Sequence, residues 1–436
     1  MNLKQLKEKH NLAEIELLNQ KISSHKVSFT ANKLNQTEST HSDGQALRLI
    51  KDKKIGFTAM YGKIAIEDMI NNALEVLKFS PEIKFNFPQK DNSSKEINST
   101  NTNETIDALI SFCKINGEEI IEIISNATKS SSLLVDISFD VTNQSESLSN
   151  SKDLNYSYSN QFYSFSINLR ETLENDFVEI FSAVTDNSFL EHKSYVKEAL
   201  NLYLLSKKHA KIKSGSYPVL FTSKASKELI GIIEMALNGK LINQKSSPWH
   251  DKLGKKVLSS LISIKQEPKI GYMARAIDDE GSTVKSLRLV NNGILENFYF
   301  DLSSASKSNN LFKSTGNGFK NSLTSQPEPN LLNMIINSGK KSLEQIIKEI
   351  DYGLLVDQTM GGLSSNVSGE ISVNVDLGFL IEKGEIVGRV KDTMVSGNVY
   401  TALSNVLELS NTPKWYWSNI YSPDMLLGGL TITAKD

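Results

Sequence analysis

The sequence predicts an α+β protein of two domains, and three observations lead to this prediction. The chain has 436 residues, enough for two or three domains that each bury a hydrophobic core. In the first half, some stretches show helical periodicity and others alternate as β-strands do. In the second half, segments of strand length dominate. We therefore predict an N-terminal, sandwich-like α/β domain with an antiparallel sheet (residues 1–211) and a β-rich C-terminal domain (residues 212–436).

The first hundred residues alternate between the two kinds of pattern. Apolar residues at helical spacing predict helices over residues 3–19 and 64–77. Between these helices we expect short strands at 26–34, 45–50 and 54–60, with tight turns at the polar clusters 41–44 and 51–54. Residues 90–103 contain a single apolar residue, Ile97, and are expected to form an exposed, linker-like loop.

The rest of the first half predicts a helix, a meander and a connecting helix. A helix is expected over residues 104–127, broken in two at Asn116-Gly117. Alternating apolar residues over 132–183 predict consecutive strands. A charged, leucine-bearing helix over 191–211 would then lead into the second domain, whose boundary we place near residue 212.

The second half opens with a strand over 217–222 and a helix from about residue 224 to 237. The helix should end at Asn238-Gly239, because glycine accepts the left-handed conformation of a helix cap. A short helix is expected over 342–350. Strands are expected at 287–290, 294–300, 353–357, 370–381, 385–390 and 427–433.

Composition excludes several classes of function. The formal net charge of -2 provides no field that would attract nucleic acid or an anionic membrane. Residues 1–20 carry charges every few positions, unlike a secretory signal, and no run approaches the roughly 20 apolar residues that span a bilayer. Cys113 is the single cysteine, so a disulfide framework and a multi-thiolate metal site are excluded. We expect a cytoplasmic protein without nucleic-acid or membrane partners.

The sequence lacks the usual catalytic motifs of peptidases. A zinc peptidase of the HExxH or HExxxH type needs two histidines on one helix and a glutamate that activates water. The six histidines lie at 10, 25, 41, 192, 209 and 250, and none is three to five positions from another. A Gly-X-Ser-X-Gly elbow is also missing, and Cys113 lies in a predicted amphipathic helix, where we interpret it as a buried apolar residue.

Glycine and aromatic clusters in this sequence do not have the spacing or the surroundings of known binding motifs. Residues 314–318 (STGNG) lack the spacing of a phosphate loop, and the pairs 361–362 and 428–429 are interpreted as turns. The run 415–417 (WYW) has no basic groove beside it in sequence, so packing or an interface is favoured over base stacking.

Several blocks, taken in order, resemble the TldD/PmbA family, also known as modulator of DNA gyrase. The resemblance covers most of the chain, and its specificity comes from the order and spacing of blocks that are individually weak. The blocks are residues 42–62, 217–241, 251–261, 276–300, 314–318 and 368–398.

This family has two branches, which differ in the helix after the strand at 217–222. TldD-like members carry HExxxH there, whereas TldE/PmbA-like members do not. By this resemblance Ile230 and Met235 stand at the histidine positions and Gly231 at the glutamate position. TldD-like members also take a cysteine ligand near the C-terminus, and residues 411–422 contain no cysteine. The chain thus resembles the TldE/PmbA-like branch.

The resemblance implies a subunit with no zinc or other cofactor of its own, paired with a TldD-like catalytic subunit that carries the zinc. Together the two would enclose extended, unstructured or leader peptides and cleave them. Gly316, Asn317, Gly318, Gly397 and Asn398 match family segments expected near the substrate channel, with simple turn formation as the alternative. Two other hypotheses stay open: a self-associating peptide-binding scaffold, which could be a homodimer, and catalysis by an unrecognised metal site in this chain alone.

Overall fold

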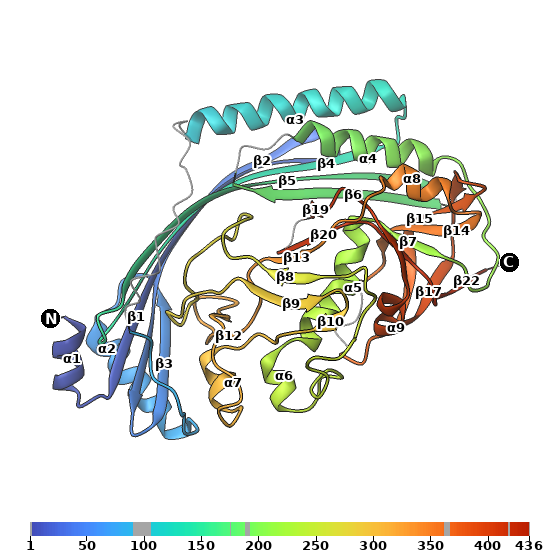
Figure 1. Cartoon of the computed structure of the whole chain (residues 1–436). Coiled ribbons are helices and arrows are strands. Elements are labelled where there is room, and N and C mark those ends of the chain that lie inside the picture. The colour runs from blue at the N-terminus through green and yellow to red at the C-terminus, as the bar shows by residue number, and fades with distance from the viewer. Residues whose placement is uncertain are drawn as a thin grey trace.

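The computed structural model describes residues 2–89, 106–174, 176–187, 192–361, 367–416 and 419–435. It is a mixed α+β structure in which a long, curved antiparallel sheet, shaped like half a barrel, wraps over a β-rich C-terminal half (Figure 1). The predicted fold class is confirmed. The loop expected at 90–103 lies outside the described residues, as do Glu191, Gly362 and Trp417.

The curved sheet is built from two meanders that meet at their first strands. Its order is β3-β2-β1-β4-β5-β6, and each neighbouring pair is antiparallel. The strands are β1 (Glu14–Thr30), β2 (Lys33–Lys51), β3 (Lys54–Tyr61), β4 (Leu134–Asn150), β5 (Asn155–Leu173) and β6 (Asp176–Asp186).

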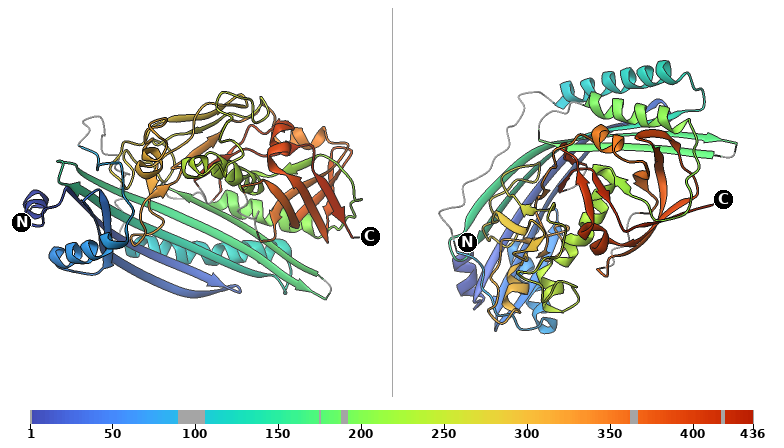
Figure 2. Two further views of the ribbon diagram at one scale, coloured as in Figure 1. Left: turned by 90° about the horizontal axis from the view of Figure 1, so that it is seen from below. Right: turned by 45° about the vertical axis from the view of Figure 1, so that its right-hand side comes forward.

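The two faces of this sheet differ in polarity in the part of β4 and β5 that lies beneath the helices. On the outer face, Phe139 and Ile167 are buried beneath α3 (Ile106–Thr128) and α4 (His192–Ser206), which lie on the convex side (Figure 1). On the inner face, the intervening residues Ser138, Ser164 and Ser166 are polar and half-buried. Figure 2 shows the C-terminal half seated against this inner face. Here the period-2 alternation directs hydrophobic packing outward and leaves mostly polar side chains inside, whereas farther along the same inner face Leu18, Leu148 and Tyr156 form a buried apolar cluster.

Two expectations at the N-terminus were wrong. The helix expected over 3–19 ends early as α1 (Leu3–Lys9), and Asn11, at φ 49°, turns the chain into β1. Ile15 and Leu18 are buried on opposite faces of a strand flanked on both sides, so tertiary pairing overrides the helical spacing. The turn expected at 41–44 is continuous strand in β2, because the polar residues there pair with β1.

The predicted turn at 51–54 is present, and Asp52 and Lys53 both have positive φ. The predicted helix at 64–77 appears as α2 (Ile66–Val76) followed by the short helix η1 (Leu77–Phe79).

The expected break at Asn116-Gly117 is absent, because α3 runs through both residues. Gly117 faces the ring of Phe29 from β1, and a Cβ there would lie 2.1 Å from a ring carbon. The glycine therefore permits a close approach of helix and sheet. Cys113, on the same helix, is buried as predicted, and burial raises the pKa of its thiol to about 12.

The C-terminal half contains two larger sheets and a small hairpin among its described residues. The sheet orders are β10-β9-β8-β13-β20-β19, β18-β21-β7-β14-β15-β17-β22 with β16 beside β15, and β11-β12. The strands are β7 (Val219–Phe221), β8 (Ile264–Gln266), β9 (Leu287–Asn291), β10 (Ile294–Leu295), β11 (Gly318–Phe319), β12 (Glu328–Pro329), β13 (Met334–Ile336), β14 (Tyr352–Thr359), β15 (Glu370–Glu382), β16 (Glu385–Arg389), β17 (Thr393–Asn398), β18 (Val406–Leu409), β19 (Lys414–Trp415), β20 (Ile420–Ser422), β21 (Met425–Leu427) and β22 (Thr431–Ala434).

Helices fill the spaces around these sheets: α5 (Ser223–Ala236), α6 (Gly239–Asn243), α7 (Leu302–Ser306), α8 (Leu343–Lys348) and α9 (Val399–Ser404). The helices expected after the first strand and at 342–350 are therefore present, but Gly239 does not form the expected left-handed cap and instead begins α6, which Asn238 caps. The strand expected at 427–433 is divided between β21 and β22, with Gly429 at φ 79° in the turn between them.

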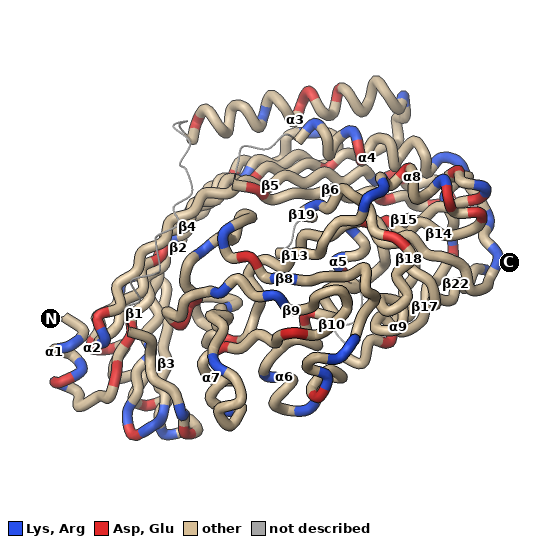
Figure 3. Tube along the Cα trace, in the orientation of Figure 1, with Lys and Arg blue, Asp and Glu red and all other residues tan. Residues whose placement is uncertain are grey.

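The two halves share a hydrophobic core. Tyr203 on α4 belongs to the same buried cluster as Leu220, Leu355 and Phe379 from the C-terminal half. The boundary near residue 212 stays a prediction. Within the described ranges, no helix is both long enough and apolar enough to cross a membrane. Basic and acidic residues alternate along the chain trace without a one-signed stripe in the view of Figure 3.

Candidate functional site

Helix α5 is the element at which, by the family resemblance, TldD-like members carry their zinc motif, and one of its sides packs into the hydrophobic core. Thr222 caps its start by accepting a hydrogen bond from the backbone N–H of Ala225. Ile230 is completely buried, whereas Met235 is half-buried and packs against that core. Gly231 faces open space, since no atom lies within 4 Å of where its Cβ would be. Residues 230 and 235 are about 140° apart around a helix, so their side chains diverge.

A buried ion pair lies at the start of the same helix. The Lys224 ammonium group contacts the Asp357 carboxylate and donates hydrogen bonds to the Gln358 Oε1 (2.9 Å) and to the carbonyl of Phe181 (2.8 Å). Asp357 also accepts a hydrogen bond from the Thr222 hydroxyl at 3.1 Å. The Tyr416 ring lies beneath the ammonium, 5.5 Å from its centroid. Oxygen atoms and a π face thus surround the lysine.

This ion pair belongs to a row of side chains along the free edge of β6. Gln358 accepts from the N–H of Phe181 and donates to the carbonyl of Glu179, as a neighbouring strand would. Tyr416 donates to the carbonyl of Phe181, and Arg389 donates to that of Phe177. Side chains of the C-terminal half therefore satisfy an edge that would otherwise be open to strand pairing.

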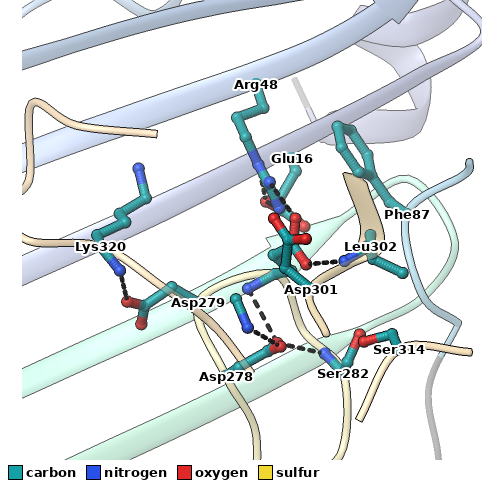
Figure 4. A network of polar contacts seen from close by, with 12 residues as sticks. Glu16, Arg48, Phe87, Asp278, Asp279, Ser282, Asp301, Leu302, Ser314 and Lys320 are labelled. Atoms are coloured by element: carbon teal, nitrogen blue, oxygen red, sulfur yellow. Dashed lines mark hydrogen bonds and ion pairs between the residues drawn. The ribbon is translucent and has the colours of Figure 1, made fainter. Parts of the chain in front are cut away.

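A second polar region, the acid cluster, joins the inner face of β1, β2 and β4 to the acidic loop (residues 275–282). Its members are Glu16, Arg48, Glu146, Arg275, Asp278, Asp279, Glu280, Asp301 and Lys320, several of which appear in Figure 4. The Arg48 guanidinium binds Glu16 at 2.6 Å and reaches Glu280 at 3.4 Å. It also lies 5.0 Å from the centroid of the Phe87 ring. One guanidinium thus contacts two carboxyl groups that come from distant parts of the chain.

The acidic loop is shaped by its own carboxylates. Asp278 accepts hydrogen bonds from the backbone N–H groups of Glu280, Ser282 and Gly318, at 2.8 to 3.0 Å. Glu280 accepts from the N–H of Leu302 at 2.7 Å, at the start of α7. These bonds fix the loop against the segments that carry residues 302 and 318.

Basic residues connect the same loop to its surroundings. Arg275 reaches Asp279 at 2.9 Å and Glu146 on β4 at 3.2 Å. The backbone N–H of Lys320 donates to Asp279 at 2.8 Å. The Lys320 ammonium lies over the Phe57 ring of β3, 4.5 Å from its centroid.

Burial shifts the proton affinities of this cluster. It raises the pKa of Asp278 to about 7, even though the backbone N–H groups that donate to Asp278 act in the opposite direction. Burial and the neighbouring Asp278 raise the pKa of Glu280 well above its usual range. Burial also raises the pKa of Glu16, against the lowering effect of Arg48. The same burial, with Arg48 nearby, lowers the pKa of Lys320 to about 8.

The residues predicted to line a substrate channel lie in two different settings. Asn317 is completely buried and donates to Gln266 and to the carbonyl of Asn330, both at 2.7 Å. Gly316 has φ 75° and packs against the backbone of Thr283, beside the acidic loop. Gly318 leaves room for Glu280, because a Cβ there would lie 2.4 Å from its carboxylate.

The second predicted pair lies elsewhere in the C-terminal half. Gly397 packs against Leu430, and Asn398 caps α9 while donating to the carbonyl of Ser368 at 3.1 Å. A channel role for either group stays a prediction.

Zinc does not fit the residues of this chain that the structure describes. Among them, no group of three or more His, Cys, Asp and Glu side chains is placed to hold a metal ion. The acid cluster was missed by sequence reasoning because its members are scattered from residue 16 to residue 320. The run Asp278-Asp279-Glu280 was the one local feature of the sequence that pointed to this cluster. All three acids are buried, and acidic residues are seldom buried unless they are paired.

The chain matches sequence profiles over most of its second half and part of its first. Residues 214–434 match the profile described as PmbA/TldA metallopeptidase C-terminal domain, and residues 16–77 match PmbA/TldA metallopeptidase domain 1.

Two curated relatives carry related descriptions. A "Metalloprotease TldD homolog" from Buchnera aphidicola subsp. Acyrthosiphon pisum is 33% identical over 205 residues, covering 46% of this chain and 42% of that protein. A "Metalloprotease PmbA homolog" from Haemophilus influenzae is 27% identical over 293 residues, covering 66% of this chain and 62% of that protein. The match thus spans less than two thirds of the length of either relative.

Among solved structures, TldE from Thermococcus kodakarensis has a TM-score of 0.89 at 22% identity, with 99% of each chain covered. At this identity the likeness shows a shared fold.

Proposed function

Because the chain belongs to the PmbA/TldD family of metallopeptidases, we propose that it is a TldE/PmbA-like, non-catalytic subunit. Its partner is a TldD-like subunit that carries zinc and cleaves the peptide. This chain contributes a wall of the chamber and positions unstructured or leader peptides, without a cofactor of its own. The proposal includes a cytoplasmic location, which the single cysteine supports.

The arrangement of α5 is the observation that carries this proposal. The helix at which the family resemblance locates a zinc motif has Ile230 in the core and Gly231 facing open space. Its first turn is occupied by the buried lysine that pairs with Asp357. A zinc ion needs three or more protein ligands from nitrogen, sulfur or carboxylate oxygen, and this helix supplies no histidine or cysteine.

The polar inner face of the sheet supports a peptide-handling role. Ser138, Ser164 and Ser166 are half-buried on the concave wall, and Ser24 on β1 donates to Asp140 beside them. Short polar side chains can hydrogen-bond a peptide main chain without selecting particular side chains. Such a wall suits a chamber that accepts many extended sequences.

A cleavage assay with and without the cognate TldD-like protein tests the proposal. An unstructured polypeptide is incubated with the zinc subunit alone, with this chain alone and with the mixture, and cleavage is followed by mass spectrometry. We expect cleavage by the mixture and none by this chain, which should hold zinc below stoichiometry. The matched control is the mixture after zinc chelation and then zinc return.

Three outcomes would overturn the proposal. A zinc subunit as active alone as in the mixture would remove the need for a partner. Stoichiometric zinc and peptidase activity in this chain alone would instead favour an unrecognised metal site. Peptide binding and self-association of this chain, with no effect on the zinc subunit, would favour the scaffold alternative.

A further inference from the structure

We propose that copies of this chain associate head to tail, with a basic loop of one copy docked on the outward face of α3 of the next copy. The basic loop is residues 251–256 (DKLGKK), and the α3 face consists of Ile115, Glu118, Glu119 and Glu122. The partner of each surface is therefore a second copy of this chain. This contact does not require the proposed function.

The α3 face points away from the curved sheet. The opposite side of the helix, which carries Ile120, is buried in the core between helix and sheet. Residues three and four positions apart are neighbours on a helix, so Glu118 and Glu119 adjoin Ile115, and Glu122 follows them. The Ile115 side chain is 65% exposed, and the three glutamates are exposed as well. Within the described ranges, no ion pair neutralises any of these glutamates.

The basic loop is exposed along its whole length. Lys252, Lys255 and Lys256 flank Leu253, whose side chain is 47% exposed. None of the three lysines forms an ion pair with a residue that the structure describes. Asp251 is the single acid of the loop, so the loop carries a net positive charge. The loop therefore repeats the arrangement of the α3 face, an exposed apolar residue among like charges, with the opposite sign.

The main chain of the basic loop is held by the strand beside it. Gly254, at φ 76°, donates to the carbonyl of Leu295 at 2.7 Å, and the N–H of Leu295 donates to the carbonyl of Lys255 at 3.0 Å. Lys256 pairs with Ile294, whose side chain is 44% exposed and extends the apolar part of this surface. Because the loop is already ordered, docking has to immobilise side chains alone, which lowers its entropic cost.

The two surfaces lie on opposite sides of the curved sheet. Helix α3 covers the convex side, whereas β10, which holds the basic loop, belongs to the C-terminal half on the concave side (Figure 1 and Figure 2). The loop and the helix cannot meet within one molecule, so a contact between them joins two copies. Because the two surfaces differ, the contact is heterologous, and its repetition adds further copies.

Charge complementarity favours this contact over a symmetric one. Two α3 faces, or two basic loops, would bring like charges together across the interface. The α3 face against the loop instead brings three glutamates to three lysines and an exposed isoleucine to an exposed leucine. Lys114 on α3 and Asp251 in the loop are the opposing charges, and each is outnumbered. Exposed ion pairs are individually weak and are screened by salt, so we expect a weak association that needs low ionic strength.

Sedimentation velocity of the full chain tests the contact. At about 50 mM NaCl, the sedimentation coefficient should rise with protein concentration up to about 0.5 mM, through dimers to larger species, as expected of a small interface. At about 500 mM NaCl the apparent association constant should be at least about tenfold lower, because the Debye length shortens from about 14 Å to about 4 Å.

Charge reversal at each surface makes the test specific. The helix variant carries Glu119→Lys and Glu122→Lys, and the loop variant carries Lys255→Glu and Lys256→Glu. Either variant alone brings like charges to the contact, so its association constant at low salt should fall at least about tenfold. An equimolar mixture restores opposite charges at both kinds of contact and should associate again, within about threefold of the unmodified chain.

The matched control carries Glu382→Lys and Glu385→Lys, at two exposed positions of the hairpin between β15 and β16. It changes the net charge as the helix variant does, but outside both surfaces, and should associate like the unmodified chain.

An unmodified chain that stays monomeric at low salt would overturn the contact. Association that persists in both variants would overturn it as well, as would variants that stay monomeric when mixed. Binding of the basic loop to vesicles of anionic phospholipid, without self-association, would also overturn it and would assign the loop to a membrane surface.

Discussion

The two faces of the curved sheet differ in what they contribute. The outer face buries Phe139, Phe165 and Ile167 beneath helices, and the Phe139 and Phe165 rings lie 5.1 Å apart. Beside these residues, the inner face presents mostly polar side chains at the alternate positions of the same strands, the charged Asp140 and Arg170 among them. A step of one residue along these strands thus moves from a side chain that packs in the core to one that faces the concave side. Lys224 and the acid cluster lie at the contact between the sheet and the C-terminal half, and they connect these two parts of the chain.

Ile167→Ala on the outer face should have the largest effect. Ile167 is completely buried, and removing a buried isoleucine side chain loses both transfer free energy and packing. We expect the free energy of unfolding to fall by about 4 kcal/mol in urea denaturation. A loss below about 1 kcal/mol would mean that the outer face does not carry the stability.

Lys224→Met at the contact between the sheet and the C-terminal half should have an intermediate effect. The substitution keeps an unbranched side chain but leaves Asp357 buried without its cation. We expect the free energy of unfolding, again from urea denaturation, to fall by about 3 kcal/mol, because breaking a buried ion pair leaves one charge buried without a partner. Adding Asp357→Leu should recover part of this loss, and a double variant no more stable than the single one would argue against the pair.

Ser166→Ala on the inner face should have the smallest effect. Ser166 adjoins Ile167 in sequence but points to the concave side, where it is half-buried. We expect the free energy of unfolding to stay within about 0.5 kcal/mol of the unmodified chain. A loss comparable to that of Ile167→Ala would abolish the division between the faces.

The fold was predictable where one local pattern decided the structure. Helices α2 and α5 follow directly from apolar residues at helical spacing, and the meander β4–β5–β6 follows from alternation. Prediction failed where distant partners decided it. Ile15 and Leu18 have helical spacing but lie in a strand held by β2 and β4.

The candidate site was less accessible to sequence reasoning than the fold. Lys224 meets Asp357 from 133 positions away, and nothing near either residue signals the contact. The family resemblance directed attention to Ile230 and Met235 farther along α5, whereas the polar contacts lie in its first turn. Long-range charge pairing leaves no local periodicity, so only the folded chain reveals it.

The junction between the two meanders also affects how the chain closes on itself. β1 to β3 are joined by connections of two residues, and β4 to β6 by connections of similar shortness. The pairing of Glu16 with Asn150, in contrast, closes a loop of more than one hundred residues. The entropic cost of closing a loop grows with loop length, although only logarithmically. The long closure falls on the β1–β4 pair alone, because the strands within each meander are near neighbours in sequence. The β1–β4 junction is therefore the topologically costly step in assembling the sheet.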